Sequence, residues 1–352
     1  MANQSVSSWF KNGTPWVWLN AGAVSISLVM VVGLLGLIAV RGLSHFWPAD
    51  IVAVDYTEPG RESIQLLGEF IDKETVSALR LKSAGVDLPE GKTSAQRFLL
   101  KIGNRDYFGL DFRWVFGPWM SEGKYPENVV AVERREWGHF YGYLSGVKED
   151  GQVVASGDAA WDELQNRLER ANGLVDQIKA IEKYEIGDIN HGLESLRLEA
   201  RALEMAGVNE GALQHQEIAQ SRQGWNEQYK VLQKELAGLY TALNSDQMMM
   251  TMSDGREVEI PLSKVVDAYR PNAMSTLDKL AFYFHEVWKF ISGNPREANT
   301  EGGVFPAIFG TVFMVMLMAV IVTPFGVVAA IYLHEYAAKN VITKMIRIAV
   351  IN

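Results

Sequence analysis

Two long apolar runs dominate the hydropathy pattern of the chain. Residues 15–40 and 302–333 contain no Asp, Glu, Lys or Arg. An α-helix needs about 20 apolar residues to cross about 30 Å of hydrocarbon, and both runs exceed that length. The pattern therefore predicts two transmembrane helices, at 16–40 and 303–333, which flank a water-exposed segment at 42–301.

The segment between the runs begins and ends with strand-like patterns. Short stretches rich in β-branched and aromatic residues alternate with clusters of Gly, Pro, Asn and Asp over 50–156 and again over 247–270, which is typical of strands and turns. Asp254 and Gly255 predict a hairpin, because Gly readily takes the positive φ of a tight turn. We expect one β-rich module, with strands at 98–102, 107–116, 129–132, 140–147 and 152–156.

A helical pattern interrupts this module at 157–246. Apolar residues recur every three or four positions, which favours helices that pack together as in a coiled coil, and Gly207 marks a chain reversal. We predict an antiparallel helical hairpin that is held together by its own stripes and projects from the module. Docking of a partner at its tip, 206–211, is the alternative. The stripes are Trp161, Leu164, Leu168, Ala171, Val175 and Ile178; Ile189, Leu193, Leu196, Ala200 and Leu203; and Trp225, Tyr229, Leu232, Leu236, Leu239 and Leu243.

A further helix is predicted just before the second run, at 275–291. Aromatic residues dominate its apolar face, which includes Phe284 and Trp288. Two interpretations remain open for this helix. It lies flat on the outer leaflet as an interfacial helix, or it packs on the β-rich module.

The orientation of the spans is predicted from the basic residues near their ends, since cytoplasmic flanks carry more Lys and Arg. The excess favours cytoplasmic termini at 1–15 and 334–352 and a periplasmic segment at 42–301. The expected location is the bacterial inner membrane. The residues counted are Lys11, Lys339, Lys344 and Arg347 on one side, and Arg41, Lys289 and Arg296 on the other.

Composition and motifs exclude several classes of function. A net charge of −9 offers no basic surface for a nucleic-acid backbone. The chain has no cysteine for a disulfide or a zinc site, and the glycine-rich nucleotide-binding motifs are absent. The mixed charges at 133–136 are typical of a solvated strand edge. We expect no catalytic, cofactor-binding or metal-ligating residues, and no enzymatic activity in this chain.

The second run contains two motifs, GGVFPAIFGT and TPFGVVAAIYLHEYA. In order and spacing they resemble the second membrane helix of PstA-type permease subunits of phosphate ABC importers. The middle of the chain is similar to the periplasmic insertion of a longer subset of these permeases. The matching positions are Gly302, Gly303, Pro306, Ala307, Gly310, Thr311, Pro324, Gly326, Ala330, Tyr332, Leu333, Glu335 and Tyr336.

The resemblance implies a fold and a set of partners. The second span would begin a MetI-like permease domain and provide part of the path for inorganic phosphate. The implied partners are a second permease subunit, an ABC ATPase dimer that hydrolyses ATP and a periplasmic phosphate-binding protein, besides membrane lipid. The family continues with further helices beyond the apolar segment in which this chain ends, at Asn352, so we expect an N-terminal portion of a permease.

The residues of the second span also predict how it packs. Pro306 and Pro324 are expected to bend the helix. The small residues Gly302, Gly303, Gly310 and Gly326 are expected to permit close approach of neighbouring helices. The alternative function, from a different class, is a membrane-tethered periplasmic sensor or scaffold that acts through protein interactions.

Overall fold

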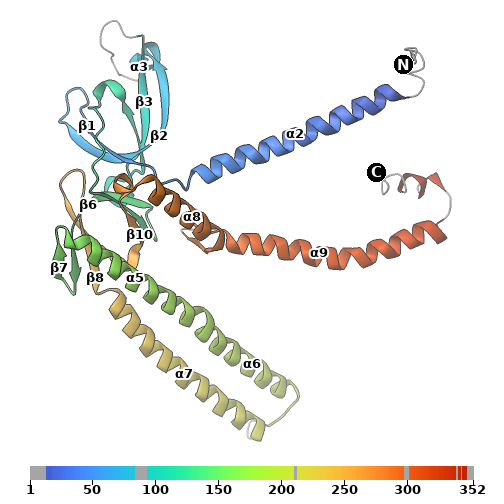
Figure 1. The fold of residues 1–352 in the computed structure, drawn as a ribbon. Helices are drawn as coiled ribbons and strands as arrows, with labels where there is room; N and C mark the ends of the chain where they lie inside the picture. Colours follow the sequence, from blue (N-terminus) through green and yellow to red (C-terminus); the bar gives the residue numbers. More distant parts are fainter. Residues whose placement is uncertain are drawn as a thin grey trace. The chain divides into compact units, whose positions relative to one another are not determined.

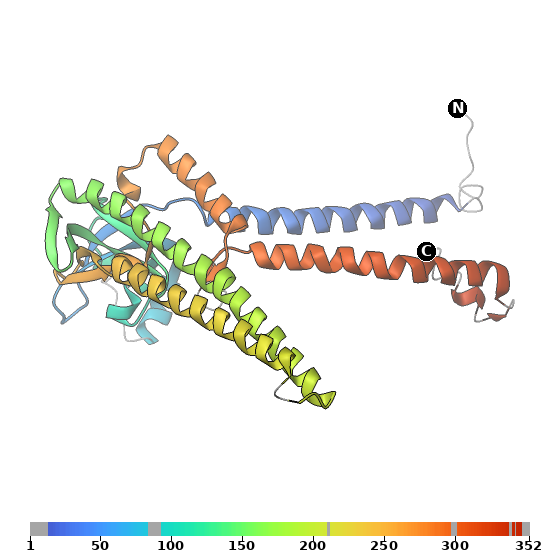
Figure 2. The ribbon, with the colours of Figure 1, turned by 90° about the horizontal axis from the view of Figure 1, so that it is seen from below.

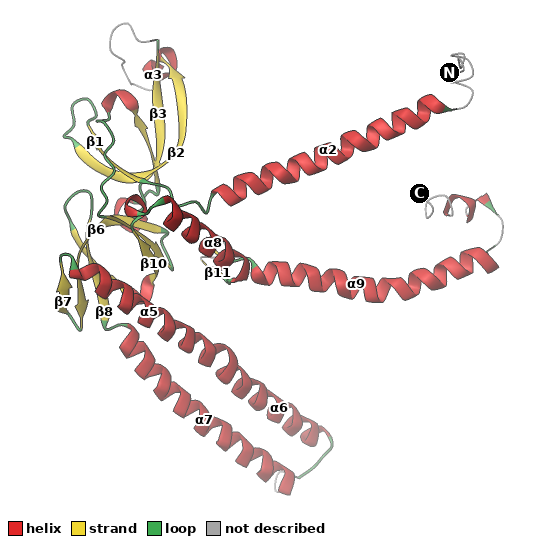
Figure 3. Cartoon of the chain, viewed as in Figure 1, coloured by secondary structure: helices red, strands yellow, loops and turns green. Residues whose placement is uncertain are grey.

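The computed structural model describes residues 13–83, 93–209, 212–296, 301–337, 340–341 and 343–346. The chain divides into two units: Pro48–Lys279, and Met1–Trp47 together with Leu280–Asn352. The α+β class predicted from the sequence is confirmed (Figures 1 and 3). Several predictions fall outside the described residues, namely Lys11, Lys339, Arg347, most of the tail at 1–15 and part of the hairpin tip.

The first sheet of the larger unit is a four-stranded antiparallel meander in the order β1-β2-β3-β4. Its first two strands lie in a region where the sequence analysis named no individual strand. The expected strand at 107–116 is only partly a strand, because the short helix α4 (Arg105–Phe108) precedes β4. The strands are β1 (Ile51–Tyr56), β2 (Ile64–Ser77), β3 (Ser94–Lys101) and β4 (Phe112–Phe116), with α3 (Ala78–Ser83) after β2.

The second sheet contains the remaining long strands, in the antiparallel order β10-β5-β6-β8-β9, and β7 also pairs with β6. The predicted Asp-Gly turn is confirmed between β8 and β9, where Gly255 has φ +81°. The helical insertion leaves this sheet after β7 and returns at β8. The strands are β5 (Val129–Arg134), β6 (His139–Glu149), β7 (Gln152–Ser156), β8 (Asp246–Thr251), β9 (Glu257–Pro261) and β10 (Val265–Tyr269).

The two sheets pack on each other, and both belong to the unit Pro48–Lys279, so the β-rich module expected from the sequence is built from two sheets. Ile51 and Ala53 of β1 meet Val129, Ala131 and Tyr141 of the second sheet in one buried cluster. The alternate residues of β1 and β5 are buried in other clusters. Both strands are therefore covered on both faces, which explains their continuous rather than alternating apolar pattern.

Polar side chains join the sheets at this interface. The buried Asn104 donates to the carbonyl oxygen of Tyr141 at 3.0 Å and accepts from its backbone nitrogen at 2.7 Å. Asn272 similarly donates to the carbonyl of Ile51 and accepts from its nitrogen, both at 2.8 Å. Asn104 is buried and Asn272 is half-buried, and by satisfying these backbone groups both avoid the cost of an unpaired polar atom.

The helical insertion forms an antiparallel hairpin whose arms run alongside each other (Figure 2). One arm comprises α5 (Ala159–Ala180), a π-helical turn (Ile181–Glu185) and α6 (Ile186–Met205). The other arm is α7 (Leu213–Leu243). The predicted stripes of α6 and α7 are half-buried or buried along their length, which agrees with helices packed through those residues.

The expectation that the stripes face only each other is wrong for α5. Its six buried side chains, from Ala160 to Ile178, belong to one core cluster with residues of β5, β6, β8, β9 and β10. The end of α7 also reaches this cluster, through Leu243. The stripe of α5 therefore covers the second sheet, and the base of the hairpin is part of the domain core.

The two predicted membrane helices are present in the smaller unit. Helix α2 (Thr14–Ser44) covers the first apolar run and α9 (Phe305–Ile331) most of the second. Pro15–Ser44 and Phe305–Tyr336 are long and apolar enough to cross a membrane, with mean hydropathies of 2.7 and 2.5, and no residue of their most apolar windows is buried within the chain. Their side chains are thus free to contact lipid or other helices.

Candidate membrane-anchoring site

A tight backbone turn leads into α9. Helix α8 (Thr276–Ser292) ends just before the two-residue strands β11 (Pro295–Arg296) and β12 (Glu301–Gly302), which pair antiparallel. Gly303 donates to the carbonyl of Asn294 at 2.9 Å, and Phe305 donates to that of Gly293 at 3.2 Å. These bonds connect the end of α8 to the start of α9.

Two glycines of the family-like motif lie in this turn rather than in the helix. A Cβ atom on Gly303 would lie 2.3 Å from the carbonyl carbon and oxygen of Gly293, and one on Gly302 would lie 2.6 Å from the oxygen of Asn294. Gly302 also has φ +86°, which residues with side chains rarely adopt. The expected close approach therefore occurs between two backbone segments before α9, and not between helices at these positions.

The prolines of α9 occupy different positions. Pro306 is in the first turn of α9. Backbone N–H groups in a first turn have no hydrogen-bond partner within the helix, so the N–H group that proline lacks is not needed there. The helix therefore need not bend at Pro306. Ala307 follows it, and its nitrogen donates to the carbonyl of Val304 at 3.1 Å. Pro324 lies inside the helix, which continues through it to Ile331.

The remaining small residues of α9 face open space within this chain. Among the described residues, no heavy atom outside the surrounding backbone of the helix lies within 4 Å of a Cβ placed on Gly310 or Gly326. The hydroxyl of Thr311 donates to the carbonyl of Ile308 at 2.8 Å, so it is satisfied within the helix. These positions are available to a neighbouring helix, and the predicted packing there stays a prediction.

The end of the second span is a π-helical turn, Tyr332–Tyr336. The rings of Tyr332 and Tyr336 stack with centroids 6.5 Å apart. Glu335 lies 3.0 Å from the ring nitrogen of the exposed His334. Tyrosine and charged residues at the end of an apolar helix are typical of a membrane interface.

Aromatic side chains also tie the end of α2 to α8 within the smaller unit. Phe46 lies against Phe290 with ring centroids 5.0 Å apart, and Trp47 lies 6.1 Å from Tyr283. Phe46 and Trp47 lie two and three residues beyond the end of α2. The sequence analysis did not pair these rings, because contacts between residues so far apart in sequence leave no periodic signal.

The charged run at 133–136 is not a solvated strand edge. The buried Arg134 pairs with Asp106 at 2.8 Å and donates to the carbonyls of Trp137 and Gly138. Arg135 donates to Asn172 of α5 at 2.7 Å. These cations stabilise the loop after β5 and its contact with the hairpin.

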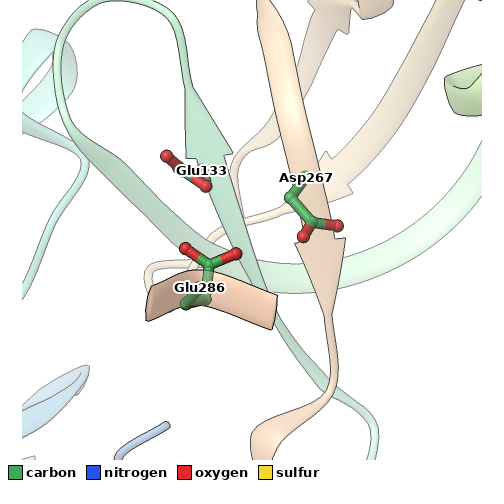
Figure 4. Close-up of side chains that lie close together, drawn as sticks. All are labelled: Glu133, Asp267 and Glu286. Carbon is green, nitrogen blue, oxygen red and sulfur yellow. The ribbon is translucent and has the colours of Figure 1, made fainter. Parts of the chain in front are cut away.

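Acidic side chains also lie on neighbouring strands next to this run. Glu133 of β5 and Asp267 of β10 are cross-strand partners (Figure 4). Glu286, also drawn there, belongs to the other unit and pairs with Lys289 at 2.9 Å. Two carboxylates on adjacent strands do not by themselves form a metal site, and we assign no ligand to them.

A cluster of ion pairs holds the base of the hairpin to the second sheet. Arg167 of α5 contacts Asp246 at 2.6 Å, Glu163 at 2.5 Å and Glu149 at 3.0 Å. The hydrogen bond from Arg167 lowers the pKa of Glu149. Burial acts to lower the pKa of Arg167, but its hydrogen bonds to the three carboxylates outweigh burial and raise it. This cluster has a structural role at the start of β8.

Comparisons with protein-family models, with curated proteins and with solved structures found no match for this chain. The resemblance to PstA-type permeases therefore rests on the motif residues in and before α9. What the structure establishes is an α+β protein with two exposed apolar helices that are long enough to span a membrane.

Proposed function

We propose that the chain is a membrane-anchored permease subunit of an ABC importer for inorganic phosphate in the bacterial inner membrane. The observation that carries the proposal is the segment 302–336. There, the family-like motif coincides with an exposed apolar helix and with a turn that has no room for a side chain at Gly303.

In this proposal the exposed surface of α9 packs against helices of the importer. Lipid and protein interiors are similarly apolar, so helices in a membrane associate through close packing of small residues. Gly310, with Thr311 beside it, provides such a surface, and nothing within the described chain covers it. The larger unit, Pro48–Lys279, would then lie in the periplasm, on the side where the phosphate-binding protein delivers its anion.

Uptake of labelled phosphate by cells tests the activity. A strain lacking the gene should lose high-affinity phosphate uptake but keep sulfate uptake, and the gene in its natural genomic context should restore it. An affinity tag at the N-terminus should co-purify an ABC ATPase from mild detergent. Unchanged phosphate uptake in the deletion strain, with no ATPase recovered, would contradict the proposal and favour a tethered sensor or scaffold.

A matched pair of variants tests the packing surface. Gly310→Leu should reduce ATPase recovery and phosphate uptake several-fold, because the larger side chain separates the helices, while insertion persists because Leu is more apolar than Gly. The control is Val320→Leu at an exposed position of the same helix, which should change neither. Equal ATPase recovery and equal phosphate uptake for the two variants would mean that the Gly310 surface contacts lipid.

A further inference from the structure

Helix α8 exposes its most apolar face. Leu277, Leu280, Phe284, Trp288 and Ile291 are between 43% and 77% exposed, and their spacing of 3, 4, 4 and 3 residues places them in one stripe along the helix. A helix on the surface of a water-soluble domain normally turns such a stripe toward the core. A contiguous apolar stripe on the outside therefore marks a contact surface.

The opposite face of α8 is the packed one, although it carries most of the charge. Glu286 and Lys289 are only partly exposed and pair with each other at 2.9 Å. Tyr283 and Phe290 on this side are half-buried and contact the aromatic residues that follow α2. The usual distribution of a soluble helix is thus inverted, which requires an apolar environment on the outer side.

From Leu280 onward α8 belongs to the smaller unit, and its contacts there indicate what that environment is. Its last turn contacts Phe46, two residues beyond the end of α2. The nitrogen of Val304, just before α9, donates to the carbonyl of Phe290 at 2.8 Å. The C-terminal end of α8 therefore lies where both candidate spans would leave the membrane, and only the short strands β11 and β12 come between α8 and α9 in the order of elements (Figure 1).

We propose that α8 is an interfacial helix that lies along the membrane surface, with its exposed stripe in the acyl-chain boundary of the bilayer. Trp and Phe are favoured at this depth because their rings combine a large apolar surface with tolerance of the polar headgroups. Ser292, at the edge of the stripe, and the charged pair on the opposite face remain toward water or protein. The proposal rests on the membrane insertion of α2 and α9, but not on phosphate transport.

The absence of cysteine makes a direct test possible, because one introduced cysteine is the only site for a thiol-reactive spin label. Full-length Phe284→Cys and Trp288→Cys are labelled in phospholipid vesicles, and the accessibility of each label to oxygen and to a water-soluble nickel chelate is measured. Val29→Cys in α2 and Ser221→Cys on the exposed surface of α7 are the lipid and water references. Ser292→Cys keeps the whole apolar stripe. It therefore reports on α8 even if Phe284→Cys or Trp288→Cys, which each remove a large side chain, misfolds.

Labels at Phe284 and Trp288 should be accessible to oxygen and shielded from nickel, at a depth of about 5–10 Å below the headgroup boundary. The label at Ser292 should lie shallower and that at Val29 much deeper. Nickel accessibility at Phe284 and Trp288 equal to that at Ser221 would overturn the proposal. Shielding from both reagents would also overturn it, because a second copy or a partner subunit would then cover the stripe. A water-like Val29 label would show instead that α2 does not span the membrane.

Discussion

Gly303, which has no side chain, allows the close backbone turn through which the chain enters α9. Gly303 passes Gly293 so closely that a methyl group would overlap its carbonyl. Gly303→Ala should therefore destabilise the turn, on the order of 1–3 kcal/mol as for other overpacked positions. The expected result is a lower melting temperature of the detergent-solubilised protein and faster proteolysis between α8 and α9.

The matched control is Gly310→Ala, at a helical position where an added Cβ would contact none of the described side chains. Alanine is the better helix former by about 1 kcal/mol, so this variant should melt at the same temperature or higher. Equal melting temperatures and proteolysis rates for the two variants would contradict the assignment of the turn.

Tyr141, at the interface of the two sheets, is expected to make the stability of the fold depend on pH in the alkaline range. Burial raises the pKa of its hydroxyl well above 10, and the nearby carboxylate of Glu69, which accepts its hydrogen bond at 2.7 Å, raises the pKa further. The folded state therefore holds this proton more tightly than the unfolded chain does. The contribution to stability is complete below about pH 10, the unfolded pKa, and is lost as the pH rises toward the folded pKa.

Urea unfolding at a series of pH values measures this contribution. Tyr141→Phe should lose about 1.5–3 kcal/mol at neutral pH, the usual range for a hydrogen bond to a charged group. Its stability should then fall less steeply than that of the unchanged protein above about pH 10. An equal fall in the stability of both proteins above about pH 10 would show that other tyrosines control the alkaline transition. One such residue is Tyr143, whose pKa is also raised by burial.

At the scale of elements, the hairpin has two parts with different roles. The base is part of the core, because α5 and Leu243 of α7 are buried against the second sheet. In the distal part the arms pack on each other, with Gly192 so close to Trp225 that a Cβ would lie 2.6 Å from the ring. Removal of the base should therefore expose the sheet, whereas removal of the distal part should not.

Two deletions test this division. Replacing 186–233 by a short Gly-Ser turn should leave a cooperative thermal transition, with a melting temperature close to that of the full chain. Replacing 157–246 should abolish the transition, since burial of each large apolar side chain contributes about 1.5–3 kcal/mol, and α5 alone loses four of them, namely Leu164, Leu168, Val175 and Ile178. Cooperative unfolding after the larger deletion would show that the second sheet folds without α5.

At the scale of the whole molecule, both spans should place the larger unit on one side of the membrane. We predict that both termini are cytoplasmic and that Pro48–Lys279 is periplasmic. Alkaline phosphatase folds only after export, so a fusion after Ser156 should be active and one after Asn352 inactive. Phosphatase activity of the fusion after Asn352, with no activity of the fusion after Ser156, would show the opposite topology.

The sequence alone determined the elements whose signal is local. The uncharged runs predicted α2 and α9, and the 3–4 spacing predicted the helices of the insertion, because periodicity and length report directly on helical geometry and on membrane thickness. The Asp-Gly turn was equally clear. The motif in and before α9 suggested a permease subunit, which stays a proposal.

Only the tertiary structure decided which surfaces meet. The stripe of α5 could not be recognised as core rather than hairpin seam, because both environments select the same apolar side chains at the same spacing. Gly303 is read as a helix-packing residue until Gly293 is seen opposite it. The apolar stripe of α8 had two interpretations in the sequence, because periodicity defines a face of a helix but not the direction in which that face points.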